Sequence, residues 1–170
     1  MGREVRKVPP NWEHPNNGYG HLQPMYDRTY DEAATEWMKE FDEFRADPKQ
    51  QASALESDCK YYWDWSSMPP DKKYYRPYSA ESATWFQLWE TVSEGTPVSP
   101  PFATADELAQ YLAVNGDDWD RKRGHGGWGI ERAQAFVKAG WAPSLAIIDG
   151  RVLHSKDIPL DADRARGRED

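Results

Sequence analysis

The sequence predicts an α+β fold, in which about three helices pack on a small antiparallel sheet with a C-terminal hairpin. Residues 31–45 repeat apolar side chains at helical spacing. Residues 84–116 contain an aromatic strand and then a helix with capping residues at both ends. Residues 144–154 hold two short runs on either side of Asp149-Gly150, a strong hairpin signal. We expect the sheet to be built from residues 84–92, 144–148 and 151–154.

The N-terminal part of the chain supplies a strand, a loop and the first helix. Residues 3–8 alternate as a short strand, which we place at an edge of the sheet. Residues 11–28 are rich in Pro, Asn and Gly and predict a loop. Residues 31–45 predict an amphipathic helix that Pro48 ends. Its apolar face carries Ala34, Trp37, Met38, Phe41 and Phe44.

The middle of the chain is less regular until residue 84. Residues 50–77 predict a short helix followed by aromatic and Pro/Tyr loops. Residues 84–92 carry apolar side chains on both faces, which is typical of a strand that is covered on both sides. Residues 104–115 then predict a helix, because Thr104 and Glu107 have the spacing of a capping box.

The C-terminal part predicts a helix and the hairpin. Residues 130–139 form the helix, which Gly140 ends, and residues 144–148 and 151–154 form two strands joined by a type I′ turn. The hydrophobic core is predicted from the inward positions of all these elements. It consists of Trp37, Phe41, Phe44, Phe86, Leu88, Leu108, Leu112, Phe136, Val137, Leu145 and Ile147.

Length and composition predict a single globular domain over residues 1–160 with long aromatic and Pro-rich loops, followed by a disordered tail over residues 161–170. One cysteine, Cys59, excludes an intramolecular disulfide and is consistent with a reducing cytoplasm. No apolar run approaches the roughly 18 residues of a membrane helix, so no membrane partner is expected. A net charge of −8 argues against direct nucleic-acid binding. It suits either a basic partner surface or simple solubility.

The sequence contains no catalytic constellation. The four histidines lack the spacing of a zinc site, and Cys59 lies between charges of opposite sign, as expected of an inert thiol. The serines lack the GxSxG context of a hydrolase nucleophile. We therefore predict no catalytic residue, no metal site and no cofactor. Whether the protein is an enzyme stays open, with the balance against it.

A glycine-rich segment, RGHGGWG at residues 123–129, precedes the helix at residues 130–139. Glycines before a helix N-terminus can cradle phosphate. The segment lacks the GKS or GKT ending of a P-loop, and charged residues precede it in place of a strand. A loop anchored by Trp128 is therefore favoured. Nucleotide binding, with His125 or an acidic residue in catalysis, is the alternative.

Two groups of side chains are candidates for binding a partner. The first is an acidic stripe on the helix at residues 31–45, where neighbouring like charges cost roughly 0.2–0.5 kcal/mol per pair. A face that accepts such repulsion can meet a basic surface, although a merely solvated face is the alternative. The second is an aromatic segment, since Tyr and Trp are common interface anchors. The candidates are Glu32, Glu36, Glu40, Glu43, Asp47, Tyr61, Tyr62, Trp63 and Trp65.

Five segments together resemble a family of small conserved proteins encoded by bacteriophages and prophages. They are VRKVPPNWEHP, YDEAATEWMKEF, KKYYRPY, WFQLWETVSEGTPVSPPFATADELAQYL and GGWGIERAQAFVKAGWAPSLAI. The resemblance covers most of the chain, up to about Ile148, but that family has no assigned function, so it implies no catalytic residues. It implies a phage protein in the cytoplasm of a bacterial host.

In that setting, small acidic proteins often resemble inhibitors of host defence, including anti-CRISPR proteins and nucleic-acid mimics. We therefore expect a phage accessory protein that binds a host protein and inhibits a nucleic-acid-handling defence complex. The partner would offer a basic nucleic-acid-binding surface, whose attraction to carboxylates is sensitive to salt. A small phage enzyme using residues 124–129, or a factor in phage assembly or regulation, is the alternative.

Overall fold

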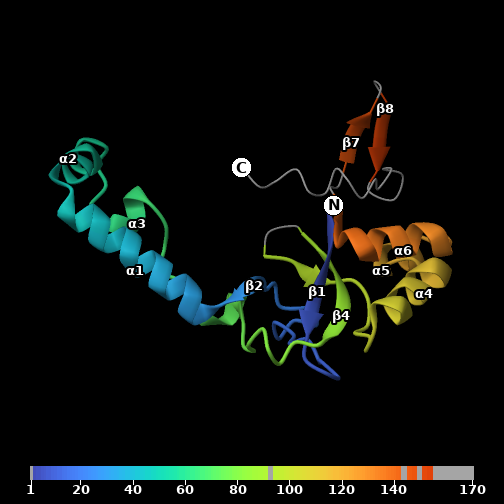
Figure 1. Cartoon of the computed structure of the whole chain (residues 1–170). Helices are drawn as coiled ribbons and strands as arrows, with labels where there is room; N and C mark the ends of the chain where they lie inside the picture. Colours follow the sequence, from blue (N-terminus) through green and yellow to red (C-terminus); the bar gives the residue numbers. More distant parts are fainter. Residues whose placement is uncertain (1, 92–93, 143–144, 149–150, 155–170) are drawn as a thin grey trace. The chain divides into compact units, whose positions relative to one another are not determined.

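The computed structural model describes residues 2–91, 94–142, 145–148 and 151–154. The fold is α+β, as predicted, and the chain divides into two compact units (Figure 1). Unit 1 comprises residues 1–24 and 78–170, and unit 2 comprises residues 25–77. Unit 2 is thus an insertion between two parts of unit 1. The single globular domain expected over residues 1–160 stays a prediction.

Unit 1 is built on a four-stranded antiparallel sheet with the strand order β5-β4-β1-β6. β1 (Arg3–Val8) pairs along its whole length with β4 (Trp85–Glu90), so that Val5 lies opposite Leu88. The short strands β5 (Thr96–Pro97) and β6 (Trp141–Ala142) form the two edges. The expectation that residues 3–8 form an edge strand is therefore wrong, because β4 and β6 occupy both sides of β1.

The predicted C-terminal hairpin is present as a pair of antiparallel strands, β7 (Leu145–Ile148) and β8 (Arg151–His154). These strands pair with each other as a separate sheet, and not with β4 as expected. The reason is that β4 already has β1 on one side and β5 on the other. The predicted type I′ turn at Asp149-Gly150 lies outside the described residues, as does the predicted disordered tail.

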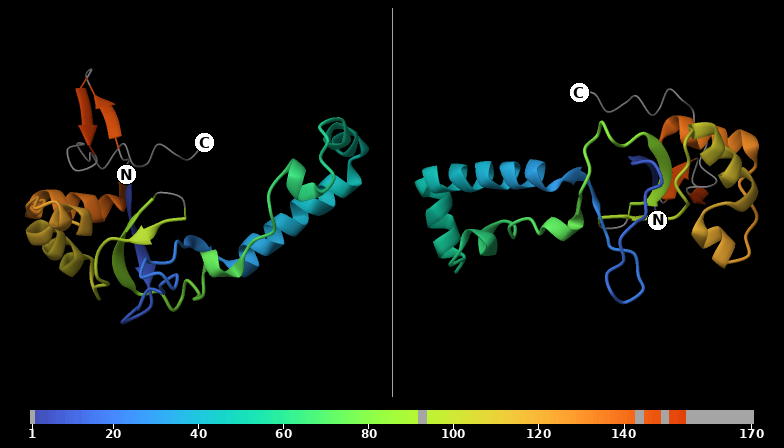
Figure 2. Two further views of the ribbon diagram at one scale, coloured as in Figure 1. Left: turned by 180° about the vertical axis from the view of Figure 1, so that it is seen from behind. Right: turned by 90° about the horizontal axis from the view of Figure 1, so that it is seen from below.

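Three helices of unit 1 gather on one side of the sheet (Figures 1 and 2). They are α4 (Ala105–Asn115), α5 (Asp118–Lys122) and α6 (Ile130–Ala139). The predicted capping box of α4 is confirmed, because Glu107 N donates to Thr104 Oγ1 at 3.2 Å and Thr104 N donates to the Glu107 carboxylate at 3.0 Å. The helix at residues 118–122 was not predicted, since the sequence there shows mostly charged residues ahead of the glycine-rich segment.

The core of unit 1 lies between these helices and the sheet. Its buried members are Leu88, Val98, Leu108, Ala109, Leu112, Ala133, Phe136 and Ala142. Four predicted core residues are among them, while Phe86 and Val137 are partly buried against this cluster. For Leu145 and Ile147, which were also predicted as core, the structure describes the strand but not the burial of the side chains. Trp89 is fully buried but was not predicted as core. The Arg6 guanidinium lies 4.4 Å from its ring centroid, and its indole N–H donates to Gln87 Oε1 at 3.2 Å.

Unit 2 begins with β2 (Tyr26–Thr29), which pairs in parallel with β3 (Tyr75–Arg76) at the end of the unit. Between them lie α1 (Tyr30–Ala46), α2 (Pro48–Glu56), α3 (Tyr62–Trp65) and the 3₁₀ turn η1 (Lys72–Tyr74). The long amphipathic helix is confirmed as α1. Both views in Figure 2 show that the chain returns along α1 after α2.

Tyr62 forms the centre of a small aromatic core in unit 2. Its side chain is 7% exposed. The Trp37, Phe41 and Phe44 rings, from the predicted inward face of α1, lie 5.5, 5.2 and 5.1 Å from its ring. Met38, which was predicted on the same face, is 48% exposed. The inward face is therefore narrower than predicted, because Tyr62 of α3 packs on Trp37, Phe41 and Phe44 and leaves Met38 exposed.

Candidate functional site

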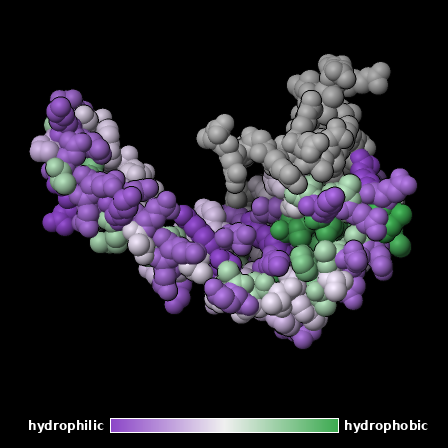
Figure 3. Space-filling model, viewed as in Figure 1, coloured by the Kyte–Doolittle hydropathy of each residue, from purple (hydrophilic) through white to green (hydrophobic). Residues whose placement is uncertain are grey.

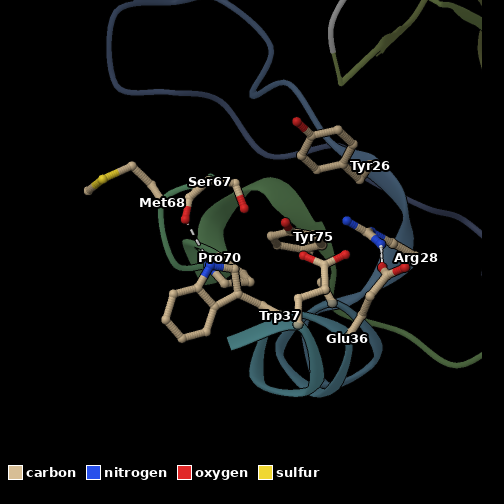
Figure 4. Close-up of a pocket in the computed structure, with 10 residues that line it drawn as sticks. Tyr26, Arg28, Glu36, Trp37, Ser67, Met68, Pro70 and Tyr75 are labelled. Atoms are coloured by element: carbon tan, nitrogen blue, oxygen red, sulfur yellow. Dashed lines mark hydrogen bonds and ion pairs between the residues drawn. The ribbon is translucent and has the colours of Figure 1, made fainter. Parts of the chain in front are cut away.

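A groove of about 480 Å³ lies within unit 2, between α1, the strands β2 and β3, and the segment that follows α3. Figure 4 shows Ser67, Met68 and Pro70 on one side of the groove and Tyr26, Arg28 and Glu36 on the other, with Tyr75 between them. Ala33, Trp37 and Glu40 of α1 complete the lining. The groove therefore combines aromatic rings, apolar side chains and charges of both signs.

The charged side of the groove is centred on Arg28. Its guanidinium lies 5.9 Å from the Tyr26 ring and 5.7 Å from the Tyr75 ring, and those two rings lie 5.1 Å apart. It also forms an ion pair with the Glu36 carboxylate. Desolvation opposes the charge of Arg28, but hydrogen bonds to Glu36 and Tyr75 outweigh it and raise the pKa above its ordinary value. The guanidinium is thus held against two aromatic rings.

Trp37 forms the other fixed part of the groove. Its indole N–H donates to the Ser67 carbonyl at 2.9 Å, a contact that Figure 4 marks. The ring is also stacked on Phe41, with centroids 5.4 Å apart and planes inclined by 17°. These contacts hold the indole in one orientation beside the apolar side of the groove.

Two members of the predicted acidic stripe have local structural roles. Glu32 completes the capping box of α1, because its carboxylate accepts from Thr29 N at 2.7 Å. This backbone hydrogen bond, with a second from the Thr29 hydroxyl, lowers the pKa of Glu32. Asp47 is the N-cap of α2 and accepts from Lys49 N at 2.9 Å. Both carboxylates therefore stabilise helix N-termini rather than form part of an open array.

The other three members of the stripe lie along the exposed part of α1. Glu43 is 3.8 Å from Lys39 in an exposed pair, and Glu36 is paired with Arg28. Glu40 lines the groove together with Glu36, one helical turn away. Figure 3 shows that the visible face of this helical region is largely hydrophilic. The stripe is therefore divided between helix caps, ion pairs and the groove.

The predicted aromatic segment presents a stacked pair at the surface. The Tyr61 and Trp63 rings lie 4.7 Å apart, with planes inclined by 14°. They are 48% and 41% exposed, and Trp65 is 38% exposed. Tyr62 does not belong to this surface, because its side chain fills the core of unit 2. That placement corrects its prediction as a binding residue.

The glycine-rich segment at residues 124–129 is used to build unit 1. Trp128 N and Gly129 N donate to the Leu112 and Ala113 carbonyls at 3.0 and 3.1 Å, near the end of α4. The Trp128 indole N–H donates to the Asp120 carboxylate at 2.7 Å. Two backbone amides that could bind a phosphate are thus engaged, and the Trp128 indole is bound to a carboxylate. This arrangement favours the anchored loop over the nucleotide-binding alternative.

Sequence reasoning did not place Tyr26, Arg28, Met68 and Tyr75 in one site. Residues 26–28 and 75 are separated by some fifty positions, and the β2–β3 pairing brings them together. No periodic pattern marks that pairing, because each strand is short and partly exposed. The aromatic and proline residues near 68–78 were the available signal, but they indicated only a loop.

No family model matches this chain, and neither a curated protein nor a solved structure shows significant similarity to it. Within the described part of the chain, no three His, Cys, Asp or Glu side chains are grouped so that they could hold a metal ion. No helix in the same residues is long and apolar enough to span a membrane. The groove and the Tyr61–Trp63 pair are the strongest candidate features.

Proposed function

We propose that this chain is a phage accessory protein that acts by binding a protein in the cytoplasm of a bacterial host. The observation that carries the proposal is the concentration of exposed large apolar side chains in unit 2. These are Tyr26, Met38, Leu55, Tyr61, Trp63, Trp65 and Met68. Exposed Trp, Tyr and Met that gather on one unit are typical of protein-binding surfaces, where aromatic side chains supply most of the affinity.

The Tyr61–Trp63 pair is suited to anchor such an interface. Its two rings are already stacked, so little conformational entropy is lost when they are ordered against a partner. The pair lies in the same unit as α1, which carries six carboxylates and two basic side chains. This charge supports a partner with a basic surface. The phage setting and the inhibition of a nucleic-acid-handling defence complex, as by anti-CRISPR proteins, rest on the sequence resemblance and on this charge.

The proposal can be tested by affinity capture from a host lysate. The parent chain, a Tyr61→Ser/Trp63→Ser double variant and a Tyr19→Ser control are used as baits. Tyr19 is 88% exposed and belongs to unit 1, so the control removes an equally accessible ring elsewhere. We expect a nuclease or helicase complex with the parent and the control, but a loss of about tenfold or more with the double variant.

Two results would contradict the proposal. Equal capture by the double variant would show that the aromatic pair does not anchor the interface. Recovery of virion proteins alone would favour the assembly factor instead. A plating assay completes the test, because expression of the parent chain should raise phage plating on a host that carries the captured defence complex. The double variant should not raise it.

A further inference from the structure

We infer that the groove of unit 2 binds the guanidinium of an arginine side chain presented by the partner. The inference rests on the proposed function and adds the chemistry of the contact. The groove is lined by three aromatic side chains, Trp37, Tyr26 and Tyr75, and by two carboxylates, Glu36 and Glu40. Aromatic faces attract cations through their quadrupole, and carboxylates form paired hydrogen bonds with a guanidinium.

The chain already holds one guanidinium in this way. Arg28 lies over the Tyr26 and Tyr75 rings and pairs with Glu36. Arg28 therefore neutralises one of the two carboxylates and covers one end of the aromatic lining. Glu40 and Trp37 are the carboxylate and the aromatic ring of the groove that remain for a second cation.

The Glu40 carboxylate supplies the charge for a second cation. In the described residues, no basic side chain forms an ion pair with Glu40, whereas Lys39 pairs with Glu43 and Arg28 with Glu36. Because Arg28 already neutralises Glu36, the charge of Glu40 leaves the groove with a net negative charge. An incoming guanidinium beside Glu40 balances that charge. This complementarity selects a cation over a neutral or acidic group.

The size and rigidity of the groove favour arginine over lysine. Its volume of about 480 Å³ lies within the range of sites that enclose a ligand. The Ser67 hydrogen bond and the Phe41 contact fix the Trp37 ring before binding. A planar guanidinium stacks on such a ring and is more weakly hydrated than an ammonium group, so it is transferred into the groove at a lower cost.

The test uses the full chain labelled with nitrogen-15 at tryptophan. The indole N–H of Trp37 lies in the groove, and a Trp37→Phe variant assigns its NMR signal. The probes are Nα-acetyl-arginine amide, its neutral isostere Nα-acetyl-citrulline amide and Nα-acetyl-lysine amide. We expect a saturable shift of the Trp37 signal with the arginine probe, a weaker response with the lysine probe and none with the citrulline probe.

Two variants locate the site. Glu40→Gln should weaken binding of the arginine probe by about threefold, as expected for one exposed charge pair. Asp42→Asn removes the same charge from the same helix but lies outside the groove, so it should leave the affinity unchanged. Equal shifts with arginine and citrulline probes, equal binding of the lysine probe, or a Glu40→Gln variant with parental affinity would each overturn the inference.

The two proposals fail separately. If the arginine probe does not bind but host capture still depends on Tyr61 and Trp63, the arginine site is wrong and the proposed function stands. If the probe binds and the aromatic double variant captures the host protein as well as the parent does, the arginine site stands and the proposed function is wrong.

Discussion

His14 shows how the surroundings of one side chain select the tautomer of its neutral ring. Its Nε2 atom lies 2.6 Å from the Gln23 carbonyl, and the Trp12 indole N–H donates to Nδ1 at 3.4 Å. Only the neutral ring with its proton on Nε2 satisfies both contacts. Desolvation, and then the charge of Arg6, lower the pKa below its ordinary value of 6.5, although the Gln23 hydrogen bond opposes them. The ring also lies 4.9 Å from buried Trp89.

The lowered pKa of His14 makes stability depend on pH. The unfolded chain binds this proton more tightly than the folded chain does. The contribution of His14 to the free energy of unfolding is therefore fully present above pH 6.5, and it falls as the pH decreases from 6.5 towards the lower pKa of the folded state. We expect the free energy of unfolding, from denaturant titrations at about pH 7.5 and about pH 5, to fall more for the parent than for His14→Gln. An identical loss in both proteins would contradict this assignment.

At the scale of elements, the connection from α4 to α6 is held by a close approach at Gly127. A Cβ atom at this position would lie 2.1 Å from the Ala113 carbonyl oxygen and 2.5 Å from the Val114 carbonyl group. The next residues then donate their N–H groups to the last turn of α4. The glycine is thus required by the packing of its own backbone against a helix end.

This packing predicts that alanine is harmful at one of two neighbouring glycines and tolerated at the other. Gly127→Ala should destabilise the protein by about 1–3 kcal/mol, because neither carbonyl group can move without disturbing α4. Gly126→Ala is the matched control, since its Cβ atom would meet nothing within 4 Å. Midpoints of denaturant unfolding measure both changes. If Gly127→Ala were as stable as Gly126→Ala, the loop would not pack on α4 as described.

At the scale of the whole molecule, each unit buries its own side chains. Unit 1 has the larger core, with Leu88, Leu108 and Leu112 fully buried. Unit 2 depends on Tyr62 and the rings around it. Since the two cores are built from different parts of the chain, we expect each unit to open separately.

Reciprocal core substitutions test this expectation. Tyr62→Ala should destabilise unit 2 by about 3–5 kcal/mol, and Leu112→Ala should destabilise unit 1 by about 2–5 kcal/mol. Hydrogen exchange of the backbone amides should show faster exchange in α1 only for the first variant and in α4 only for the second. Equal acceleration in both helices for either variant would instead support the single cooperative domain expected from the sequence.

The sequence by itself determined the elements whose signals are local. α6 spans the predicted residues, and the capping box of α4 follows from the spacing of Thr104 and Glu107. The same holds for β1, β4 and the inward face of α1, since hydrophobic periodicity depends only on neighbouring residues. Periodicity could not show that Tyr62 is buried, because the segment YYWDW has no clear alternation of apolar and polar residues.

Only the tertiary structure decided which elements meet. It placed β1 between β4 and β6, separated β7 and β8 from that sheet, and joined β2 to β3. The last pairing assembles the groove, by bringing Arg28 and Tyr75 together across some forty-seven positions of sequence. Strand pairing is a choice among distant partners with similar local patterns, so backbone hydrogen bonding and side-chain packing settle it, and no single segment encodes it.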